Sequence, residues 1–397
     1  MTNCHRSLLI TGCATVLLAI IALILQVAPK TLSLRHVSET RPLLIHSIHS
    51  YNGGIQSTGS ETVGNEYCIT FVGDTMLANL GHDYSTSFLR HARDSFKYVR
   101  PLLRKCSTVI ANLEGPVTKL GLEHDPFRKS PAYSFNMDPL LPYLLVDEGI
   151  THVNRANNHL LDRGGVGVSD TTYALEAADL PSFGFGMSEE EASRPLMLNM
   201  RYHIGITGYS DLYSQGHLPD PQTNQSGVLP VTKEYAGLGR RLLDEHGANL
   251  RIAFVHWGEN YGLVSTEMKG QAAILIKAGF DIVIGSDGSH SVQNVEIING
   301  KPVLFNIGNF LFQTPGRFDK LSALPYGLVV HLMLDKDTGE VARLELHCTH
   351  IDNRVVYFQP RICTARQAVS LFSTLGPEIV HEKNNTFATV QLKRKGV

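Results

Sequence analysis

From Tyr67 onward, short apolar runs alternate with longer amphipathic stretches, and this alternation restricts the fold more than any other feature of the chain. The runs have the length of buried strands, whereas most of the stretches space their apolar residues three or four positions apart, as helices do. The predicted strands are Tyr67–Val72, Thr108–Asn112, His152–Asn154, His203–Gly208, Leu250–His256, Ile282–Ile284, Val303–Ile307 and Leu328–Leu334. The predicted helices are Tyr84–Leu103, Pro139–Glu148, Gly167–Ala178, Lys233–Glu245, Glu267–Ala278 and Ala365–Leu375. The pattern predicts an α/β fold with helices covering the sheets.

Polar residues that suit a ligand site follow several of these apolar runs directly. They are Asp74, Glu114, His256 and Asp287. In open α/β sheets, ligand sites assemble at the carboxyl ends of the strands, so we expect these side chains to share one site. Five motifs carry this signal: GDTML at Gly73–Leu77, NLEG at Asn112–Gly115, NNHLLD at Asn157–Asp162, HWG at His256–Gly258, and SDGSH at Ser286–His290.

The NNHLLD motif combines a metal ligand with a proton donor. The amide oxygen of Asn158 can bind a divalent ion, while the adjacent imidazole of His159 can give a proton to a leaving oxygen. Asp162, three residues further on, can hold that imidazole in the useful tautomer. In the Ser/Gly-rich loop Gly285–Ser291, Asp287 and His290 are also three residues apart, and both can face one ion.

Taken singly, three of these residues have simpler interpretations. Asp74 suits a turn or a helix cap, and Glu114 suits a solvated strand end. His256 suits a buried core histidine. It is the recurrence of the pattern that favours a shared site.

Composition limits the remaining possibilities. The 397 residues are 43% hydrophobic, enough for one large domain or two ordinary ones, and the net charge of −2 gives no basic excess for nucleic acid.

Leu8–Ala28 is almost wholly apolar and, at about 21 residues, long enough to cross a bilayer, so we predict a membrane anchor; a cleaved signal peptide is the alternative. The predicted organisation is an anchor (1–28), a polar tether (29–66), a main domain (67–375) and a tail (376–397).

The six cysteines do not form a recognisable framework. Cys4 and Cys13 lie in or beside the predicted anchor, and the other four are widely spaced without a C-x-x-C motif. We expect those four to be buried thiols or to form at most one or two bridges.

In order and spacing, the motifs resemble the capsule-synthesis CapA/PgsA family of poly-γ-glutamate capsule proteins, which is related to calcineurin-like metallophosphoesterases. ITFVGDTML, VIANLEGPVT, ITHVNRANNHLLDRG and VEIINGKPVLFNIGNFLF are the most specific segments, and the resemblance covers about Tyr67–Leu375. It implies a four-layer α-β-β-α sandwich preceded by one transmembrane helix, and a site for two divalent ions. The implied ligands are Asp74, Glu114, Asn158, His256 and His290, with Glu114 bridging the ions. His159 would be the general acid, oriented by Asp162.

The resemblance also implies a metal preference and a function. Asp287 stands where members commonly have a histidine, which favours Mn²⁺ or Mg²⁺, with Zn²⁺ or iron as alternatives. The implied protein is a capsule synthesis or export factor, its domain held outside the cell membrane, with a metal-dependent hydrolase-like site. Its expected partners are poly-γ-glutamate, an anionic polymer, and other membrane subunits of the synthesis complex. The alternatives are a non-catalytic polyanion-binding or scaffold subunit and, more remotely, a surface adhesin without an ion.

Overall fold

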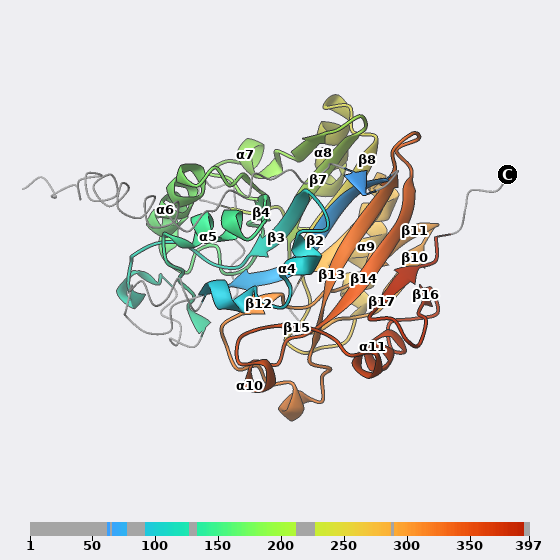
Figure 1. Ribbon diagram of the computed structural model, residues 1–397. Helices are drawn as coiled ribbons and strands as arrows, with labels where there is room; N and C mark the ends of the chain where they lie inside the picture. The colour runs from blue at the N-terminus through green and yellow to red at the C-terminus, as the bar shows by residue number, and fades with distance from the viewer. Residues whose placement is uncertain are drawn as a thin grey trace, which may run out of the picture. The chain divides into compact units, whose positions relative to one another are not determined.

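Two β-sheets form the centre of the fold (Figure 1). The structure, a computed structural model, describes residues 62–63, 66–77, 92–126, 133–211, 227–286 and 290–392. All of these belong to one unit, Gly59–Val397. The fold of the described residues is mixed α/β, as the sequence pattern predicts.

The larger sheet has eleven strands and the smaller has six. The path of the larger sheet is β16 (Ile379–Val380), β17 (Phe387–Val390), β14 (Val341–His350), β13 (Tyr326–Asp335), β2 (Glu66–Met76), β3 (Thr108–Leu113), β4 (His152–Asn154) and β5 (Ser182–Phe183). Beside this path, β1 (Thr62–Val63) and β12 (Leu311–Phe312) pair with β2, and β15 (Arg361–Ile362) pairs with β14. The smaller sheet runs β10 (Val295–Ile298), β11 (Lys301–Leu304), β9 (Ile282–Ser286), β8 (Leu250–His256), β7 (His203–Ser210) and β6 (Leu196–Asn199).

Each sheet contains a parallel block whose strands end at the same edge. In the larger sheet β2, β3, β4 and β5 are parallel, and in the smaller sheet β7, β8, β9 and β11 are parallel. The register places Asp74 of β2 opposite Asn112 of β3. In the same way, it places His256 of β8 opposite Ser286 of β9. The carboxyl ends of the two blocks therefore carry Asp74 and His256, two of the polar residues that the sequence singled out.

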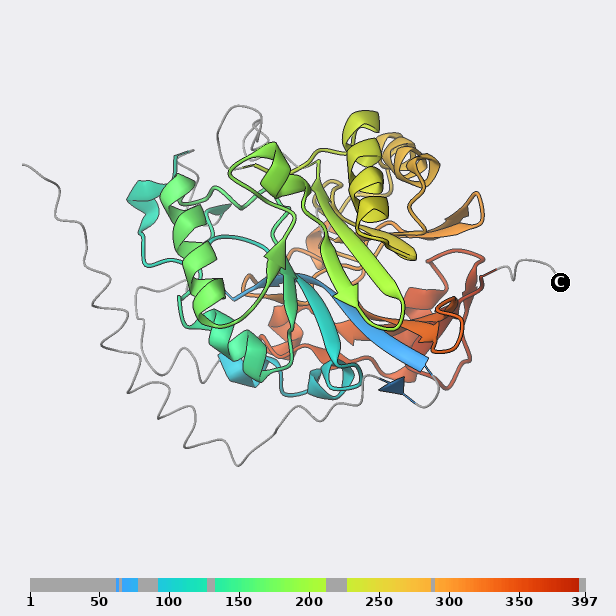
Figure 2. The same ribbon diagram turned by 90° about the horizontal axis from the view of Figure 1, so that it is seen from above.

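The core residues show four layers. The two sheets face each other across an apolar core in which the rings of Phe71 and Phe254 meet edge to face at 5.7 Å. On the outer face of the larger sheet, Val72 belongs to a second core with α4 (Arg100–Leu103), α5 (Leu141–Asp147) and α6 (Gly164–Ala177). On the outer face of the smaller sheet, Val255 belongs to a third core with α8 (Lys233–Glu245) and α9 (Thr266–Ala278). Figure 2 shows α8 and α9 side by side on that face.

Helix boundaries follow ordinary capping chemistry. The Thr232 side chain accepts a hydrogen bond from the Tyr235 N–H at the start of α8, and Ser265 does the same for Met268 at the start of α9. Gly279, with φ of 110°, ends α9 in the left-handed conformation that glycine adopts most easily. Other helices in the described residues are α7 (Glu189–Ser193), α10 (Asn353–Val356) and α11 (Ala365–Phe372), with short 3₁₀ turns at Leu122–His124 and Asp319–Leu321.

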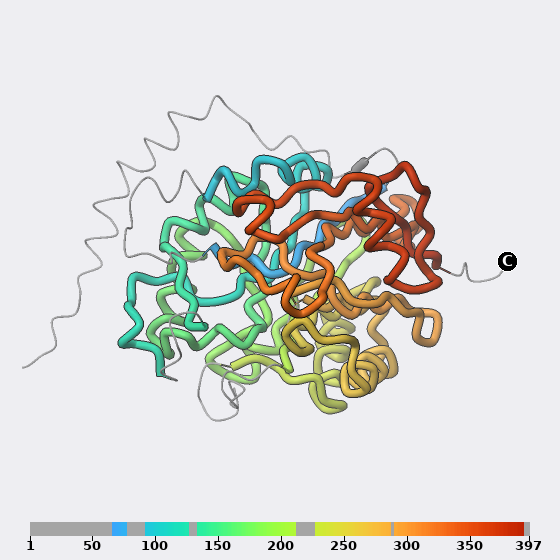
Figure 3. The backbone as a smooth tube through the Cα atoms, turned by 90° about the horizontal axis from the view of Figure 1, so that it is seen from below, coloured from blue at the N-terminus to red at the C-terminus, as the bar shows by residue number. Residues whose placement is uncertain are grey.

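Two expectations about the chain's elements need correction. Only residues 92–103 of the predicted helix Tyr84–Leu103 are described. Within them the helix is interrupted, and the last helical segment is α4. Pro101 suits the first turn of a helix but breaks a helix interior, so a continuous helix through it is disfavoured. Residues after 375, expected as a tail, contribute β16 and β17 to the larger sheet. In Figure 3 the red C-terminal segment lies on the side opposite the yellow segment that contains α8.

The predicted anchor Leu8–Ala28 lies outside the described residues, as does most of the predicted tether. None of the described helices combines the length and apolar character needed to span a bilayer. The four cysteines of the main domain form two disulfides, Cys68–Cys106 and Cys348–Cys363. Of the two expected outcomes, buried thiols or at most one or two bridges, the structure therefore has the second.

Candidate metal centre

Gly73 determines how β2 presents Asp74. The pairing of β2 with β3 shifts register between Val72 and Asp74, an irregularity of the kind that redirects side chains near active sites. A Cβ atom at Gly73 would lie 1.7 Å from the backbone oxygen of Gly308, so only glycine allows this approach. Asp74 itself is fully buried.

Three potential ligands from both sheets converge at the carboxyl ends of the strands. Asp74 lies in β2 and Glu114 directly follows β3 in the larger sheet, and His256 is the last residue of β8 in the smaller one. One donor atom of each lies within 4.8 Å of the others, and the three side chains are at most 3% exposed. Ligand atoms at this separation can bind a single ion at bond lengths of about 2.0–2.4 Å. The donor set therefore fits a divalent metal.

Two amides surround the imidazole of His256. The Asn112 amide donates to Asp74 Oδ1 at 2.5 Å and lies 3.2 Å from His256 Nδ1. On the other side of the ring, Asn158 Oδ1 lies 3.0 Å from His256 Nε2. Asn158, a predicted metal ligand, thus lies beside His256. Asn112 was not among the predicted site residues, although it is the first polar residue after the apolar run of β3.

His159 is held next to this centre by contacts on three sides. Its Nδ1 lies 2.7 Å from Asp162 Oδ2, and its Nε2 lies 3.5 Å from Glu114 Oε1. The ring stacks on Phe135 at 3.9 Å, and the Phe135 N–H donates to the same Asp162 oxygen at 2.6 Å. Because an ionised carboxylate only accepts hydrogen bonds, this arrangement places a proton on Nδ1 and directs Nε2 towards Glu114.

The loop that carries Asn158 and His159 is fixed to α6 by a buried arginine. Arg155 donates to Thr172 Oγ1 at 2.9 Å and to the Val168 backbone oxygen at 3.1 Å, and its guanidinium lies 3.6 Å from the centre of the Phe185 ring. Burial lowers the pKa of Arg155 to about 9. The charge is therefore retained at neutral pH, and the side chain acts as a rigid support.

His290 lies at the far end of a row of rings that starts at His159. Neighbouring centroids are 3.9 Å apart from His159 to Phe135, 5.5 Å from Phe135 to Phe312, and 5.3 Å from Phe312 to His290. His290 Nδ1 is 3.3 Å from Asn309 Oδ1. Among the described residues, His290 is not part of the close group formed by Asp74, Glu114 and His256. Asp287 lies outside the described residues.

Asp211 is a further carboxyl at this edge that the sequence analysis missed. It follows β7, and its backbone N–H donates to the His256 carbonyl oxygen at 3.1 Å. Burial raises the pKa of Asp211 to about 6. Repulsion from Glu267 also raises this pKa, whereas the hydrogen bond from the Val231 N–H lowers it.

The fold and the donor set define a two-sheet α/β protein with a candidate divalent-metal centre at the carboxyl ends of its parallel strands. Residues 68–314, more than half of the chain, match the family described as "Bacterial capsule synthesis protein PGA_cap". The chain therefore belongs to this bacterial capsule synthesis family, and the resemblance noted from the motifs is confirmed.

Three relatives that are similar in sequence agree with this assignment. The chain is 27% identical over 283 residues to "PGA biosynthesis protein CapA" of Bacillus subtilis, covering 70% of this chain and 71% of that one. It is 26% identical to "Capsule biosynthesis protein CapA" of Bacillus anthracis, covering 64% and 62% respectively. A "Probable polyglutamine synthesis accessory protein" of Mycobacterium tuberculosis is 30% identical over 39% of this chain and 43% of its own length. Among solved structures, the calcineurin-like phosphoesterase YfkN of Bacillus subtilis aligns with a TM-score of 0.44 at 15% identity, covering 78% of this chain and 96% of that one.

Proposed function

We propose that this family member is a membrane-anchored factor of capsule polymer synthesis or export, and that its buried centre binds divalent metal and hydrolyses a bond in an anionic substrate. The observation that carries the proposal is the convergence of Asp74, Glu114 and His256 within 4.8 Å, beside an oriented imidazole. The names of the relatives support poly-γ-glutamate as the polymer. The bond cleaved is an amide of that polymer or a phosphoester.

The donor chemistry suits a hard divalent ion. Asp74 and Glu114 offer carboxylate oxygen, Asn158 offers amide oxygen, and His256 offers one imidazole. Oxygen-rich sets favour Mn²⁺ or Mg²⁺ over Zn²⁺. We assign a first ion to these residues and propose, from the sequence pattern, that Asp287 and His290 are ligands of a second. When bound, such ions supply Lewis acidity that polarises a substrate oxygen and acidifies a water molecule.

His159 acts as the proton donor in this proposal. With Nδ1–H bound to Asp162, a protonated imidazole carries its second proton on Nε2, which faces Glu114 and the centre. That proton passes to the leaving oxygen or nitrogen of the substrate. General acid catalysis of this kind contributes about 10²–10⁴-fold to a rate.

The test is turnover of defined substrates by the metal-loaded, full-length protein. With Mn²⁺ present, we expect hydrolysis of poly-γ-glutamate or of a simple phosphodiester, and we expect His159→Asn to lower it at least about 100-fold. The matched control is His246→Asn, which removes an exposed imidazole at the end of α8. The proposal is overturned if both variants keep wild-type turnover.

The alternative is a non-catalytic subunit that binds the polymer through metal ions, and family membership supports it equally. On this account neither substrate is cleaved, yet the polymer binds in a Mn²⁺-dependent way. His159→Asn then leaves that binding unchanged, because no proton is transferred. Glu114→Gln weakens binding in both accounts, so it identifies the centre as the polymer site.

We also propose that residues 8–28 anchor the protein in the cell membrane, with the domain outside. The apolar length of this segment supports the anchor. The other membrane subunits of the synthesis complex would then be its neighbours. The test is fractionation of cells that produce the protein either whole or without residues 1–28. The deletion should move the protein from the membrane fraction to the soluble fraction.

A further inference from the structure

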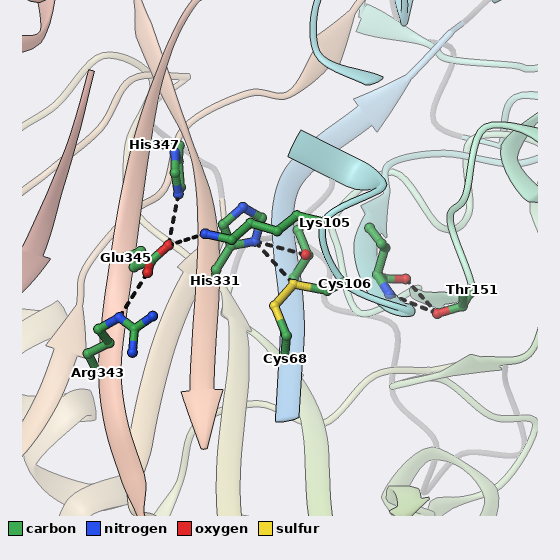
Figure 4. The surroundings of a disulfide bond; sticks show 10 residues. Cys68, Lys105, Cys106, Thr151, His331, Arg343, Glu345 and His347 are labelled. Atoms are coloured by element: carbon green, nitrogen blue, oxygen red, sulfur yellow. Dashed lines mark hydrogen bonds and ion pairs between the residues drawn. A yellow bond between two sulfur atoms is a disulfide. The ribbon is translucent and has the colours of Figure 1, made fainter. Parts of the chain in front are cut away.

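A second group of metal-binding side chains lies on the larger sheet, and nothing in the proposed function uses it. Three ligand atoms lie within 4.8 Å of one another: the sulfur of Cys68, the sulfur of Cys106 and a ring nitrogen of His331. The three side chains are 1%, 6% and 0% exposed. The two cysteines form a disulfide, and the imidazole lies next to it (Figure 4).

This group is separate from the candidate metal centre. Cys68 and Cys106 lie just before the first paired residues of β2 and β3, where Ile69 is opposite Thr108. Asp74 lies near the other end of β2, five residues beyond Ile69. Cys68 and Asp74 are six residues apart, so at about 3.3 Å per residue roughly 20 Å separates them along the strand. The two groups therefore lie at opposite ends of the same pair of strands.

The buried imidazole is what distinguishes this pair from a simple cross-link. His331 Nδ1 lies 3.4 Å from Cys106 Sγ and 3.0 Å from Thr70 Oγ1, so this nitrogen faces the sulfur atoms. Its Nε2 has no hydrogen-bond partner among the described residues, so no bond at Nε2 fixes the tautomer. Nδ1 is therefore able to present its lone pair to a ligand. A disulfide alone gives no reason to bury a polar ring here, because an apolar side chain would fill the space without an unpartnered nitrogen.

The surroundings keep water away from the group and connect it to charged residues. Met333, two residues along β13 from His331, forms a buried cluster with both cysteines. The ring of His347 meets that of His331 edge to face at 4.5 Å, and Glu345 bonds both His347 and Lys105. Figure 4 shows Lys105 and His347 converging on Glu345 beside the disulfide.

We propose that Cys68, Cys106 and His331 form a redox-gated site for one thiophilic divalent ion such as Zn²⁺. A dithiol reductant gives two electrons to the S–S bond and becomes a disulfide itself, leaving two protein thiols. Ion binding then displaces the two thiol protons, and two thiolates with one imidazole are common zinc ligands. Reoxidation by a disulfide-bearing oxidant reverses these steps and releases the ion. The segment between β2 and β3 is thus cross-linked either by the disulfide or by the metal.

Cobalt(II) is the probe that tests this site, because thiolate ligands give Co²⁺ a charge-transfer absorption that carboxylate and imidazole ligands do not. The full-length protein would carry Cys4→Ser and Cys13→Ser, so that those thiols do not contribute. It would be reduced with a dithiol, freed of reductant without oxygen, and titrated. In the reduced protein we expect one Co²⁺ to bind with the thiolate band, and one Zn²⁺ to displace it. In the oxidised protein we expect no thiolate band.

Three variants in this background make the test specific. Cys68→Ser with Cys106→Ser should abolish the thiolate band, whereas Cys348→Ser with Cys363→Ser should retain it. His331→Gln keeps both sulfur ligands and should weaken Co²⁺ binding at least about tenfold. If the first variant fails to fold, His331→Gln decides the question.

The proposal is overturned if the reduced protein shows no thiolate band, if the band survives in folded Cys68→Ser/Cys106→Ser protein, or if His331→Gln binds as tightly as the parent. Because the carboxylate centre contributes nothing to the band, these results do not depend on the proposed function.

Discussion

At the residue scale, Asn112 links the two sheets at the candidate centre. Its amide contacts Asp74 on one side and His256 on the other. Local sequence patterns identify charged and imidazole ligands by type, but they do not identify an amide whose importance comes from its neighbours. Six predicted site residues do come close together in the structure: Asp74, Glu114, Asn158, His159, Asp162 and His256.

Replacing Asp162 with asparagine tests the orientation of His159. The side-chain amide N–H introduced by this change would favour the tautomer with a bare Nδ1, because it donates where the carboxylate accepts. We expect the Asp162→Asn variant to lose about 100-fold or more in turnover while its metal content stays unchanged. Steady-state kinetics and elemental analysis measure these two quantities. Equal turnover in the variant and wild type would show that Asp162 only supports the Phe135 backbone.

A second residue, His152 on β4, makes stability depend on pH. Burial lowers its pKa from 6.5 to about 4, so the unfolded chain takes up a proton below pH 6.5 that the folded protein excludes until about pH 4. The free energy of unfolding therefore falls as the pH drops through this window, by about 2–3 kcal/mol from this residue. His331, whose pKa burial lowers to about 3, acts in the same direction.

The corresponding variant is His152→Phe, which fills the same space without titrating. Urea unfolding between pH 7 and pH 4.5 should show a shallower loss of stability in this variant than in the wild type. A slope identical to that of the wild type would contradict the assignment to His152.

At the element scale, the close approach of β2 to the backbone at Gly308 is the most sensitive packing feature near the centre. The Gly73→Ala variant puts a Cβ atom 1.7 Å from the Gly308 oxygen, and backbone cannot move as a side-chain end can. We expect a loss of at least about 2 kcal/mol in the free energy of unfolding and weaker metal binding. Chemical denaturation and a Mn²⁺ titration measure these effects.

The matched control is Gly237→Ala within α8, where an added Cβ meets nothing within 4 Å. Alanine is the better helix former by about 0.5–1 kcal/mol, so this variant should be slightly more stable than the wild type. If both variants had the same stability, the steric argument for Gly73 would be wrong.

The sequence predicted the parallel strands better than the antiparallel additions. Buried parallel strands are continuous apolar runs, and the predicted ends of β4 and β8 agree with the structure. The strand β14 was missed because its residues alternate: Leu344 and Leu346 face the core, while Arg343, Glu345 and His347 are polar. Alternation with period two was the available signal.

At the scale of the whole molecule, the candidate centre exists only because two sheets pack face to face. The larger sheet supplies Asp74 and Glu114, and the smaller one supplies His256. His256 is at least 142 residues away from the other two along the chain. Strand periodicity predicts each sheet's elements but not which sheet edges meet, because that depends on long-range packing. The recurrence of polar residues at strand ends favoured one shared site, and the family resemblance implied which residues would be its ligands.

The most direct test of the central claim is anomalous X-ray diffraction from crystals of the protein grown with Mn²⁺, recorded at the manganese edge. The account predicts an anomalous peak within bonding distance of Asp74, Glu114 and His256 donor atoms, and no such peak in Glu114→Gln crystals. Crystals of the wild-type protein without a peak between these three residues, at saturating Mn²⁺, would contradict it.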